Sequence, residues 1–199
     1  MSPVTIYCES TPNPNSMKFV FNMYINRVGP VEFTSYKDAQ KSPLAAKLFD
    51  FPFVTSVFFA SNYISINKGA FVEWEEVMLE LREFLKSYIA AGGKVLVDDV
   101  DYSKEEEIKQ KQAQASAEKI PETEIERHIM SVLDEYIRPA VEGDGGNVLF
   151  QSFENGKVSV VLQGACSGCP SSTITLKAGI EALLKRMIPE VEEVVAVEG

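Results

Sequence analysis

The chain contains, at residues 164–187, the stretch GACSGCPSSTITLKAGIEALLKRM. Two cysteines, Cys166 and Cys169, lie three positions apart on a glycine-rich turn that leads into apolar residues at helical spacing. Pro170 and two serines follow the second cysteine, and serines are good N-cap residues. The free amides and the positive dipole end of this helix would face both sulfurs and favour the thiolate. Thiolates on such a turn bind a metal, carry a redox disulfide or act as nucleophiles.

The residues around this stretch, 121–199, predict a small α+β domain in the order α-β-β-α-β, with one sheet layered against two helices. The first helix has an apolar stripe that Pro139 ends. Two strands then meet at Asn155-Gly156, a pair typical of tight hairpins. The predicted bounds are 125–137 and 171–187 for the helices and 148–153, 157–162 and 191–197 for the strands.

Residues 1–97 predict a second small α+β domain in the order β-β-β-α-β-β-α-β. Ser42 and Pro43 are suited to the start of a short helix, and Gly92 and Gly93 to the end of a long one. The predicted strands cover 4–7, 17–24, 31–35, 54–60, 63–67 and 94–97, and the predicted helices cover 43–51 and 71–90.

Between these domains, residues 98–120 are polar and contain almost no large apolar side chains. Such a segment cannot bury enough surface to fold alone, so we expect a linker that tethers the two domains.

Composition excludes several classes of function. The net charge of −10 leaves no basic stripe for phosphates, which argues against a nucleic-acid or membrane-surface partner. No apolar run approaches the roughly 20 residues that a membrane-spanning helix needs. The N-terminal residues resemble neither a signal peptide nor an arginine-rich transit helix, which predicts a cytoplasmic protein.

The cysteine pair supplies only half of a closed metal site. Zinc sites and iron–sulfur clusters of the common types use four protein ligands. The chain has one further cysteine, Cys8, in the other predicted domain, and one histidine, His128, in the middle of a predicted helix. We expect Cys8 to be a buried or half-buried structural thiol and His128 to lie at the surface. Two copies of the chain would bring four thiolates together, so the count indicates a metal centre shared by a homodimer.

Other uses of the pair remain open at this point. A dithiol oxidoreductase also places Cys-x-x-Cys before a helix, although a hairpin rather than the first strand of a βαβ unit precedes it here. A zinc-bridged structural dimer would use the same four thiolates. Nucleophilic catalysis lacks a base at a suitable spacing. Glu142 and Asp144 are better explained by a tight turn between helix and strand than by a carboxylate site.

Several longer motifs resemble a known family. The motifs RPAVEGDGGNV (138–148), GACSGCPSSTITLKAGIEALL (164–184) and IPEVEEV (188–194) resemble the C-terminal domain of NifU, the Nfu-type iron–sulfur domain. The motifs TPNPNSMKF (11–19), FFASNYISINK (58–68) and WEEV (74–77) are similar to the Nfu N-terminal domain.

The resemblance implies a non-enzymatic scaffold or carrier. It would hold a [4Fe-4S] cluster between two subunits, receive it from upstream assembly machinery and pass it to apo-proteins. Cys166 and Cys169 match the cluster ligands of the family. The further cysteine-bearing domains of full NifU are missing, which favours late delivery over primary assembly. We assign client or partner recognition to the N-terminal domain, because it has no ligand-like residues.

Overall fold

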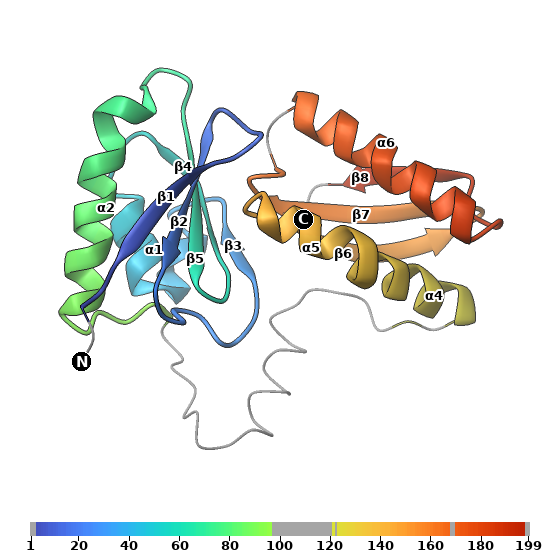
Figure 1. Ribbon diagram of the computed structural model, residues 1–199, viewed down its shortest axis with the longest axis horizontal. Helices are drawn as coiled ribbons and strands as arrows, with labels where there is room; N and C mark the ends of the chain where they lie inside the picture. The colour runs from blue at the N-terminus through green and yellow to red at the C-terminus, as the bar shows by residue number, and fades with distance from the viewer. Residues whose placement is uncertain (1–2, 97–120, 122, 168–169, 198–199) are drawn as a thin grey trace. The chain divides into compact units, whose positions relative to one another are not determined.

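The chain folds into two compact units, each with its own sheet and core (Figure 1). The computed structural model describes residues 3–96, 121, 123–167 and 170–197, without the side chains of 170–172. The N-terminal unit is described over 3–96 and the C-terminal unit over 121–197. The predicted linker, 98–120, lies outside the described residues. The predicted α+β class is confirmed, because each unit combines one sheet with helices.

The N-terminal unit is built on a five-stranded antiparallel sheet in the order β1-β2-β5-β4-β3. Alternation along β2 turns Met17, Phe19 and Phe21 towards the core, as expected for a strand with one helix-covered face. The strands are β1 Ile6–Ser10, β2 Ser16–Phe21, β3 Val31–Phe33, β4 Val54–Phe59 and β5 Tyr63–Lys68.

Two α-helices, α1 (Pro43–Leu48) and α2 (Trp74–Ala90), pack on the core side of this sheet, and a short 3-10 turn, η1 (Asp38–Lys41), precedes the first. Leu81 and Leu85 of α2 are fully buried against the strands. Ser42 caps α1, because its hydroxyl accepts a hydrogen bond from the Ala45 amide at 2.9 Å and donates another to the carbonyl of Val95.

The end of this unit differs from the prediction. Residues 94–96 do not form a strand. Val95 instead packs into the core as part of a bend, and its carbonyl is held by the Ser42 hydroxyl. The apolar residues after the double glycine predicted a strand over 94–97, of which residue 97 lies outside the described residues. Val95 is buried, but a buried residue does not require a neighbouring strand to pair with.

The C-terminal unit has a three-stranded sheet in the order β6-β7-β8. Strands β6 (Gly146–Glu154) and β7 (Lys157–Gly164) form the predicted hairpin, in which Asn155 and Gly156 adopt φ of 50° and 78°. Strand β8 (Glu193–Val197) runs parallel to β7, so helix α6 (Pro170–Met187) crosses over between them. Ile180 and Leu184 of α6 are buried in the core of the unit.

The first helical segment continues past the proline that was expected to end it. Helix α4 (Glu124–Val132) passes into a π-helical turn, η2 (Leu133–Ile137), and then into α5 (Arg138–Gly143). Pro139 occupies the first turn of α5, where its missing N–H costs nothing. The widened π turn therefore absorbs the proline. The apolar spacing that predicts this helix ends at residue 137, so the sequence does not reveal that the helical segment continues beyond it.

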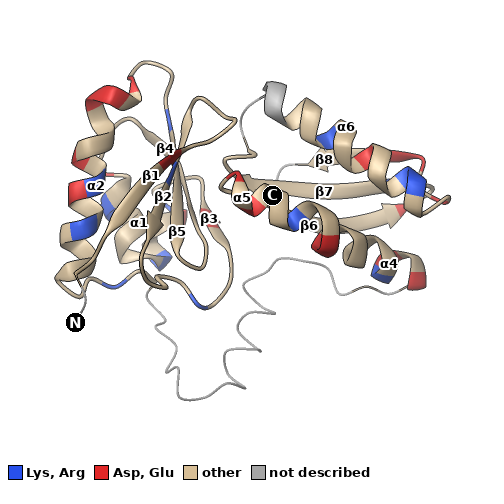
Figure 2. Cartoon of the chain, in the orientation of Figure 1, with Lys and Arg blue, Asp and Glu red and all other residues tan. Residues whose placement is uncertain are grey.

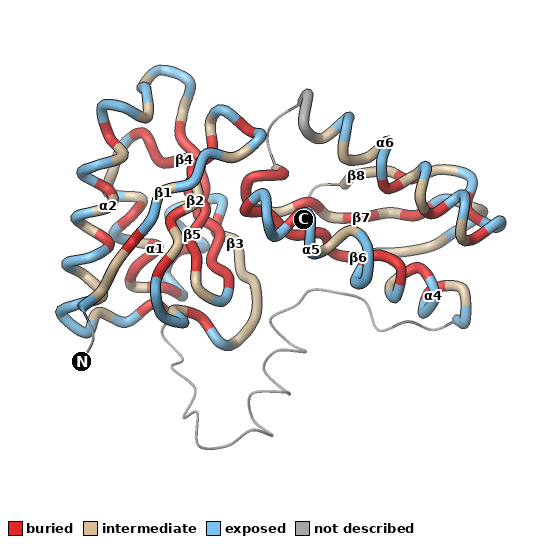
Figure 3. The backbone as a smooth tube through the Cα atoms, in the orientation of Figure 1, coloured by how far each residue is buried: buried red, intermediate tan, exposed pale blue. Residues whose placement is uncertain are grey.

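Buried residues concentrate in the strands of both units, whereas most charged residues of α2, α4 and α6 are exposed or half-exposed (Figures 2 and 3). This is the distribution that amphipathic helices on a sheet produce. Glu126 of α4 is the buried exception, and it belongs to the capping box of that helix. Among the described residues no helix combines the length and the apolarity that a membrane crossing needs.

We predict that Ser42→Ala destabilises the N-terminal unit by about 1–2 kcal/mol, because it removes a helix cap and leaves the Val95 carbonyl without its donor. Denaturant unfolding of the full chain measures this loss. Ser35→Ala is the control, since Ser35 bonds Asp38 at an exposed 3-10 turn and should cost less than half as much. Equal losses for the two variants would contradict the role given to the buried cap.

Candidate cysteine site

The cysteine turn lies at the carboxyl end of β7, between that strand and α6. The last pair of the β6–β7 ladder joins Gly146 to Gly164, and the Ala165 amide extends it by donating to the Gly145 carbonyl at 3.2 Å. The turn is therefore carried by two paired strands. Strands and helices hold a site in place more rigidly than a free loop does.

Glycine at position 146 makes room for the Cys166 sulfur. A Cβ atom added at Gly146 would lie 2.5 Å from Cys166 Sγ and 2.8 Å from the carbonyl oxygen of Gln163. The sulfur thus occupies the volume that any other residue at 146 would fill. Gly145 and Gly164 have φ of 82° and 66°, a left-handed conformation that glycine adopts more readily than residues with a side chain. These glycines form a cradle in which Cys166 is 7% exposed.

Hydrogen bonds on both sides fix the path of the turn. The Ser167 amide and hydroxyl both donate to the Gly164 carbonyl, at 3.2 and 2.8 Å. The Thr173 hydroxyl donates to the Cys166 carbonyl at 3.3 Å and so ties the first turns of α6 to the cysteine. These bonds set the position of the Cys166 backbone relative to the helix that follows it.

Helix α6 begins at Pro170, one residue before the predicted start. Ser171 and Ser172 therefore lie within its first turn, and the prediction that they cap the helix is wrong. Proline is favoured at the first helical position because it needs no hydrogen-bond partner there. Cys169, the second predicted ligand, lies outside the described residues, as does Gly168. The structure therefore locates Cys166 alone.

A chain of polar side chains joins the two strands next to this cradle. Arg138 Nη1 donates to Asn147 Oδ1 at 3.2 Å, and Asn147 Nδ2 donates to Gln163 Oε1 at 3.0 Å. Arg138 also binds the Asp134 carboxylate through Nε and Nη2, at 2.9 and 2.6 Å. The motif RPAVEGDGGNV contains two members of this chain, but the sequence gives no sign that they meet Gln163.

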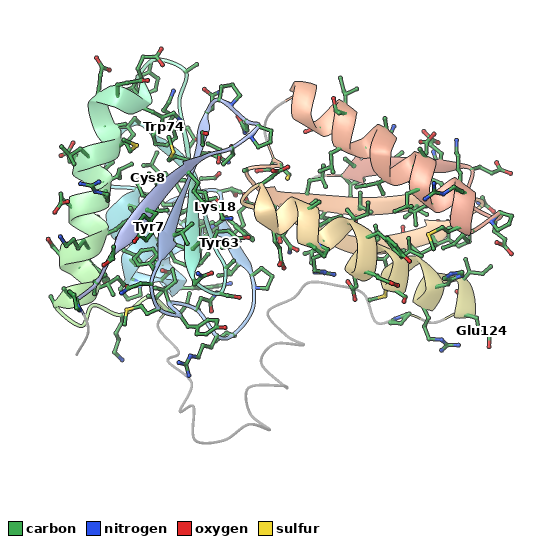
Figure 4. The ribbon with its side chains drawn as sticks, viewed as in Figure 1. Tyr7, Cys8, Lys18, Tyr63, Trp74 and Glu124 are labelled. Carbon is green, nitrogen blue, oxygen red and sulfur yellow. The ribbon has the colours of Figure 1, made fainter. Side chains whose placement is uncertain are left out.

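The other predicted residues lie where they were expected. His128 is exposed on α4. Glu142 and Asp144 are exposed around the turn between α5 and β6. Cys8 is half-buried on β1 of the N-terminal unit (Figure 4). Burial raises the pKa of the Cys8 thiol, and the charge of Arg82 offsets only part of that rise. Cys8 therefore has the character of a structural thiol rather than a reactive one.

The donor set decides which chemistry is possible. Within the described ranges, no three His, Cys, Asp or Glu side chains gather closely enough to hold a metal ion. Cys166 stands at the start of a crossover helix in a cradle of backbone, a setting that suits a soft thiolate ligand. In the sequence it pairs with Cys169 as a Cys-x-x-Cys motif, and thiolates are the donor type that iron–sulfur clusters and zinc use.

Comparison with known proteins agrees with this arrangement. The family model described as the NifU-like domain matches residues 129–195, and the model described as the N-terminal region of the scaffold protein Nfu/NifU matches residues 6–92. The chain belongs to the Nfu/NifU family. The two matches cover most of the described part of each unit, and the cysteine turn lies inside the NifU-like match.

Curated relatives match over nearly all of this Nfu/NifU chain. A NifU-like protein of Schizosaccharomyces pombe is 38% identical over 98% of the chain and 73% of its own length. The human NFU1 iron-sulfur cluster scaffold homolog, mitochondrial, is 35% identical over 95% of the chain and 70% of its own length. NifU-like protein 4, mitochondrial, of Arabidopsis thaliana is 34% identical, and the chain spans 64% of its length.

The cellular location predicted from the sequence is wrong. The human and Arabidopsis relatives are named as mitochondrial, which contradicts the expected cytoplasmic protein. Import is directed by targeting segments, which are distinct from the folded domains that the family models match. The composition of the first residues was therefore a poor basis for assigning a compartment.

We predict that Gly146→Ala disturbs the cysteine site. The new methyl group would overlap the Cys166 sulfur, so the turn must move, at a cost of about 1–3 kcal/mol. The alkylation rate of Cys166, followed by mass spectrometry, should rise as the sulfur leaves its cradle. Gly179→Ala on α6 is the control, because nothing lies within 4 Å of its added Cβ. That variant should leave the rate unchanged; an unchanged rate in Gly146→Ala as well would contradict the cradle.

Proposed function

We propose that this chain is a carrier of iron–sulfur clusters. Cys166 and Cys169 bind a [4Fe-4S] cluster as cargo, a second copy of the chain supplies two further thiolates, and the homodimer passes the cluster to apo-proteins. The observation that carries the proposal is the half-site: a cysteine sulfur set in a glycine cradle, with no third ligand gathered around it among the described residues. Relatives named as iron-sulfur cluster scaffolds support the identity of the cargo.

A shared site explains how cargo can be both held and released. Four ligands from one chain would enclose a cluster, and releasing it would require that domain to open. Two ligands from each copy place the cluster at an interface, which can separate while both domains stay folded.

Two alternatives use the same sulfurs. A zinc-bridged dimer would need the same four thiolates, and a dithiol oxidoreductase would need only one copy. The glycine cradle is filled by the Cys166 sulfur itself, so it suits a thiolate ligand in every case, and the three candidates differ in what the thiolates bind. In the zinc case the protein would bind metal but never incorporate sulfide. In the oxidoreductase case it would show a reducible disulfide within one chain.

We predict that Cys166→Ser and Cys169→Ser each abolish stable cluster binding, because symmetry doubles each loss and leaves two thiolates instead of four. Anaerobic reconstitution with iron and sulfide measures this through the visible spectrum and through iron and sulfide analysis. The native chain should give a broad charge-transfer absorption and about four irons per dimer, as a [4Fe-4S] cluster requires. It should also elute as a dimer when loaded and at lower mass when apo.

Cys8→Ser is the matched control for these variants, since Cys8 lies in the other unit and its thiol is not part of the half-site. It should reconstitute like the native chain. A normal cluster in the Cys166→Ser protein would contradict the proposal. Metal without sulfide would favour the zinc dimer, and thiol-dependent insulin reduction by the apo chain would favour the oxidoreductase.

We further propose that the two units divide the work. Residues 121–199 carry the cluster, residues 98–120 act as a tether, and residues 1–97 recognise clients or partners. A shallow surface hollow of about 440 Å³ in the N-terminal unit supports this role, and its lining comprises Tyr24, Asn26, Arg27, Gly29 and Ser61. The Tyr24 ring is 67% exposed with the Arg27 guanidinium 5.6 Å from its centroid. Exposed Tyr and Arg are the residue types most enriched at protein-binding hot spots.

The loop that carries this pair is held in shape from within. Asn26 is almost fully buried; its Oδ1 accepts from the Val28 amide at 3.0 Å and its Nδ2 donates to the Gly29 carbonyl. The amides of Ile25 and Asn26 also donate to the Ser61 carbonyl. A loop ordered in advance loses little entropy when a partner binds it.

We predict that Tyr24→Ala combined with Arg27→Ala slows cluster transfer to an apo [4Fe-4S] protein by about fivefold or more at limiting concentrations. Cluster binding by the chain itself should not change, because the hollow lies in the other unit. Tyr36→Ala with Lys37→Ala removes an equally exposed aromatic and cation outside the hollow and serves as the control. Transfer at the native rate to every acceptor tested would contradict the assignment.

A further inference from the structure

The hydrogen-bonded chain of Arg138, Asn147 and Gln163 has a fixed direction. A guanidinium group can only donate, so Asn147 must turn its amide oxygen towards Arg138. Its amide nitrogen then faces Gln163, which must in turn present its own oxygen. Each side-chain orientation is forced by the one before it. The Asp134 carboxylate anchors the other side of Arg138 with two charge-assisted bonds from Nε and Nη2.

This chain lies one ladder position from the cysteine cradle. Asn147 and Gln163 are direct partners across β6 and β7, and the next partners along the ladder are Gly146 and Gly164. Cys166 Sγ occupies the volume above Gly146. The Asn147–Gln163 bond therefore links the two strands at the pair next to the end of the ladder. The final pair, Gly146 and Gly164, has no side chains that could form such a link.

The glycine pair weakens the pairing of β6 with β7 at this end of the ladder unless neighbouring side chains link the strands. Gly146 and Gly164 have no side chains to pack across the strands, and glycine loses more backbone freedom on ordering than other residues. Arg138 adds a third attachment, because it lies at the start of α5 directly after the π-helical turn. The side-chain network therefore ties one helix to two strands, one ladder position from the Gly146–Gly164 pair. Successive strand residues face opposite sides of a sheet, so the network acts on the sulfur through the strand backbone and not by direct contact.

We propose that Arg138, Asn147 and Gln163 form a clasp that positions the Cys166 thiolate. They are positioning residues: the clasp holds the β6 and β7 ends together, the closed ends keep the glycine cradle in shape, and the cradle holds the sulfur in place. The inference rests on the proposed function only for its consequence, which is that a loosened clasp shortens the lifetime of the bound cluster. The effect of the clasp on the Cys166 thiol is present in the apo chain and does not depend on the proposed function.

Two matched pairs of variants separate hydrogen bonding from packing. Asn147→Leu keeps the side-chain size and removes both bonds, whereas Asn147→Asp still accepts from Arg138 and lets a rotated Gln163 amide donate to it. Gln163→Met removes the acceptor for Asn147, whereas Gln163→Glu keeps it. The acidic variants add negative charge, which disfavours the thiolate and so slows its alkylation. Opening of the strand ends would instead speed alkylation, so the two effects change the rate in opposite directions.

The experiment measures alkylation of Cys166 in the apo full-length chain carrying Cys169→Ser, with the modified peptide identified by mass spectrometry. Asn147→Leu and Gln163→Met should each raise the rate by about tenfold, as expected when hydrogen bonds that keep a segment closed are lost. Asn147→Asp and Gln163→Glu should react at the native rate or more slowly. Val158→Ala, buried further along β7, controls for general destabilisation of the unit and should leave the rate unchanged.

Three results would overturn the clasp. One is an unchanged alkylation rate in the two apolar variants with a lowered unfolding midpoint, which would make the network merely structural. Another is an equal rise in Val158→Ala, and the third is an equal rise in the acidic variants. Cluster lifetime in the chain with both cysteines is measured separately, and it should fall in Asn147→Leu but not in Asn147→Asp. If no cluster forms in the native chain, the proposed function fails while the alkylation result still decides the clasp.

Discussion

The site of this protein depends on the pairing of Gly146 with Gly164 at the end of the β6–β7 ladder. A Cβ atom on Gly146 would fill the space that the Cys166 sulfur occupies, so the sulfur can approach the backbone only because that atom is missing. The same absence means that the paired glycines have no side chains of their own to pack across the two strands. Stability at this point must therefore come from neighbours: the ladder behind it, the helix after it and the polar chain beside it.

Each neighbour of the cradle contributes a different restraint. The Ser167 and Thr173 hydroxyls fix the backbone on either side of Cys166. The parallel pairing of β7 with β8 makes a crossover necessary, and α6 provides it and begins at the cysteine turn. Arg138 reaches the strands because a π-helical turn accommodates Pro139 and lets the helical segment continue. The irregular helical segment thus places Arg138 where it binds Asn147 of β6.

The incompleteness of the site connects the geometry to the proposed function. In the proposed carrier, one copy supplies half of the ligands and the site is complete only when a second copy joins it, which suits cargo that must be handed on. The N-terminal unit contributes a different kind of surface, with its own core and a preshaped loop that presents Tyr24 and Arg27. Each unit matches a model of the Nfu/NifU family, so the proposed division of labour applies to a chain that contains both domains.

The sequence by itself determined the α+β class, nearly every strand and helix in order, the Asn155-Gly156 hairpin and the cysteine turn, because these follow from local periodicity and turn chemistry. It failed locally at the start of α6 and at Pro139, and it also failed where a contact distant in sequence decides the outcome. Val95 packs into the core without joining a sheet, and its carbonyl accepts a hydrogen bond from the Ser42 hydroxyl, 53 residues away. Only the tertiary structure brought Arg138, Asn147 and Gln163 together and placed Gly146 under the sulfur. Strand register sets those contacts, and register is settled by the packing of the whole sheet on its helices.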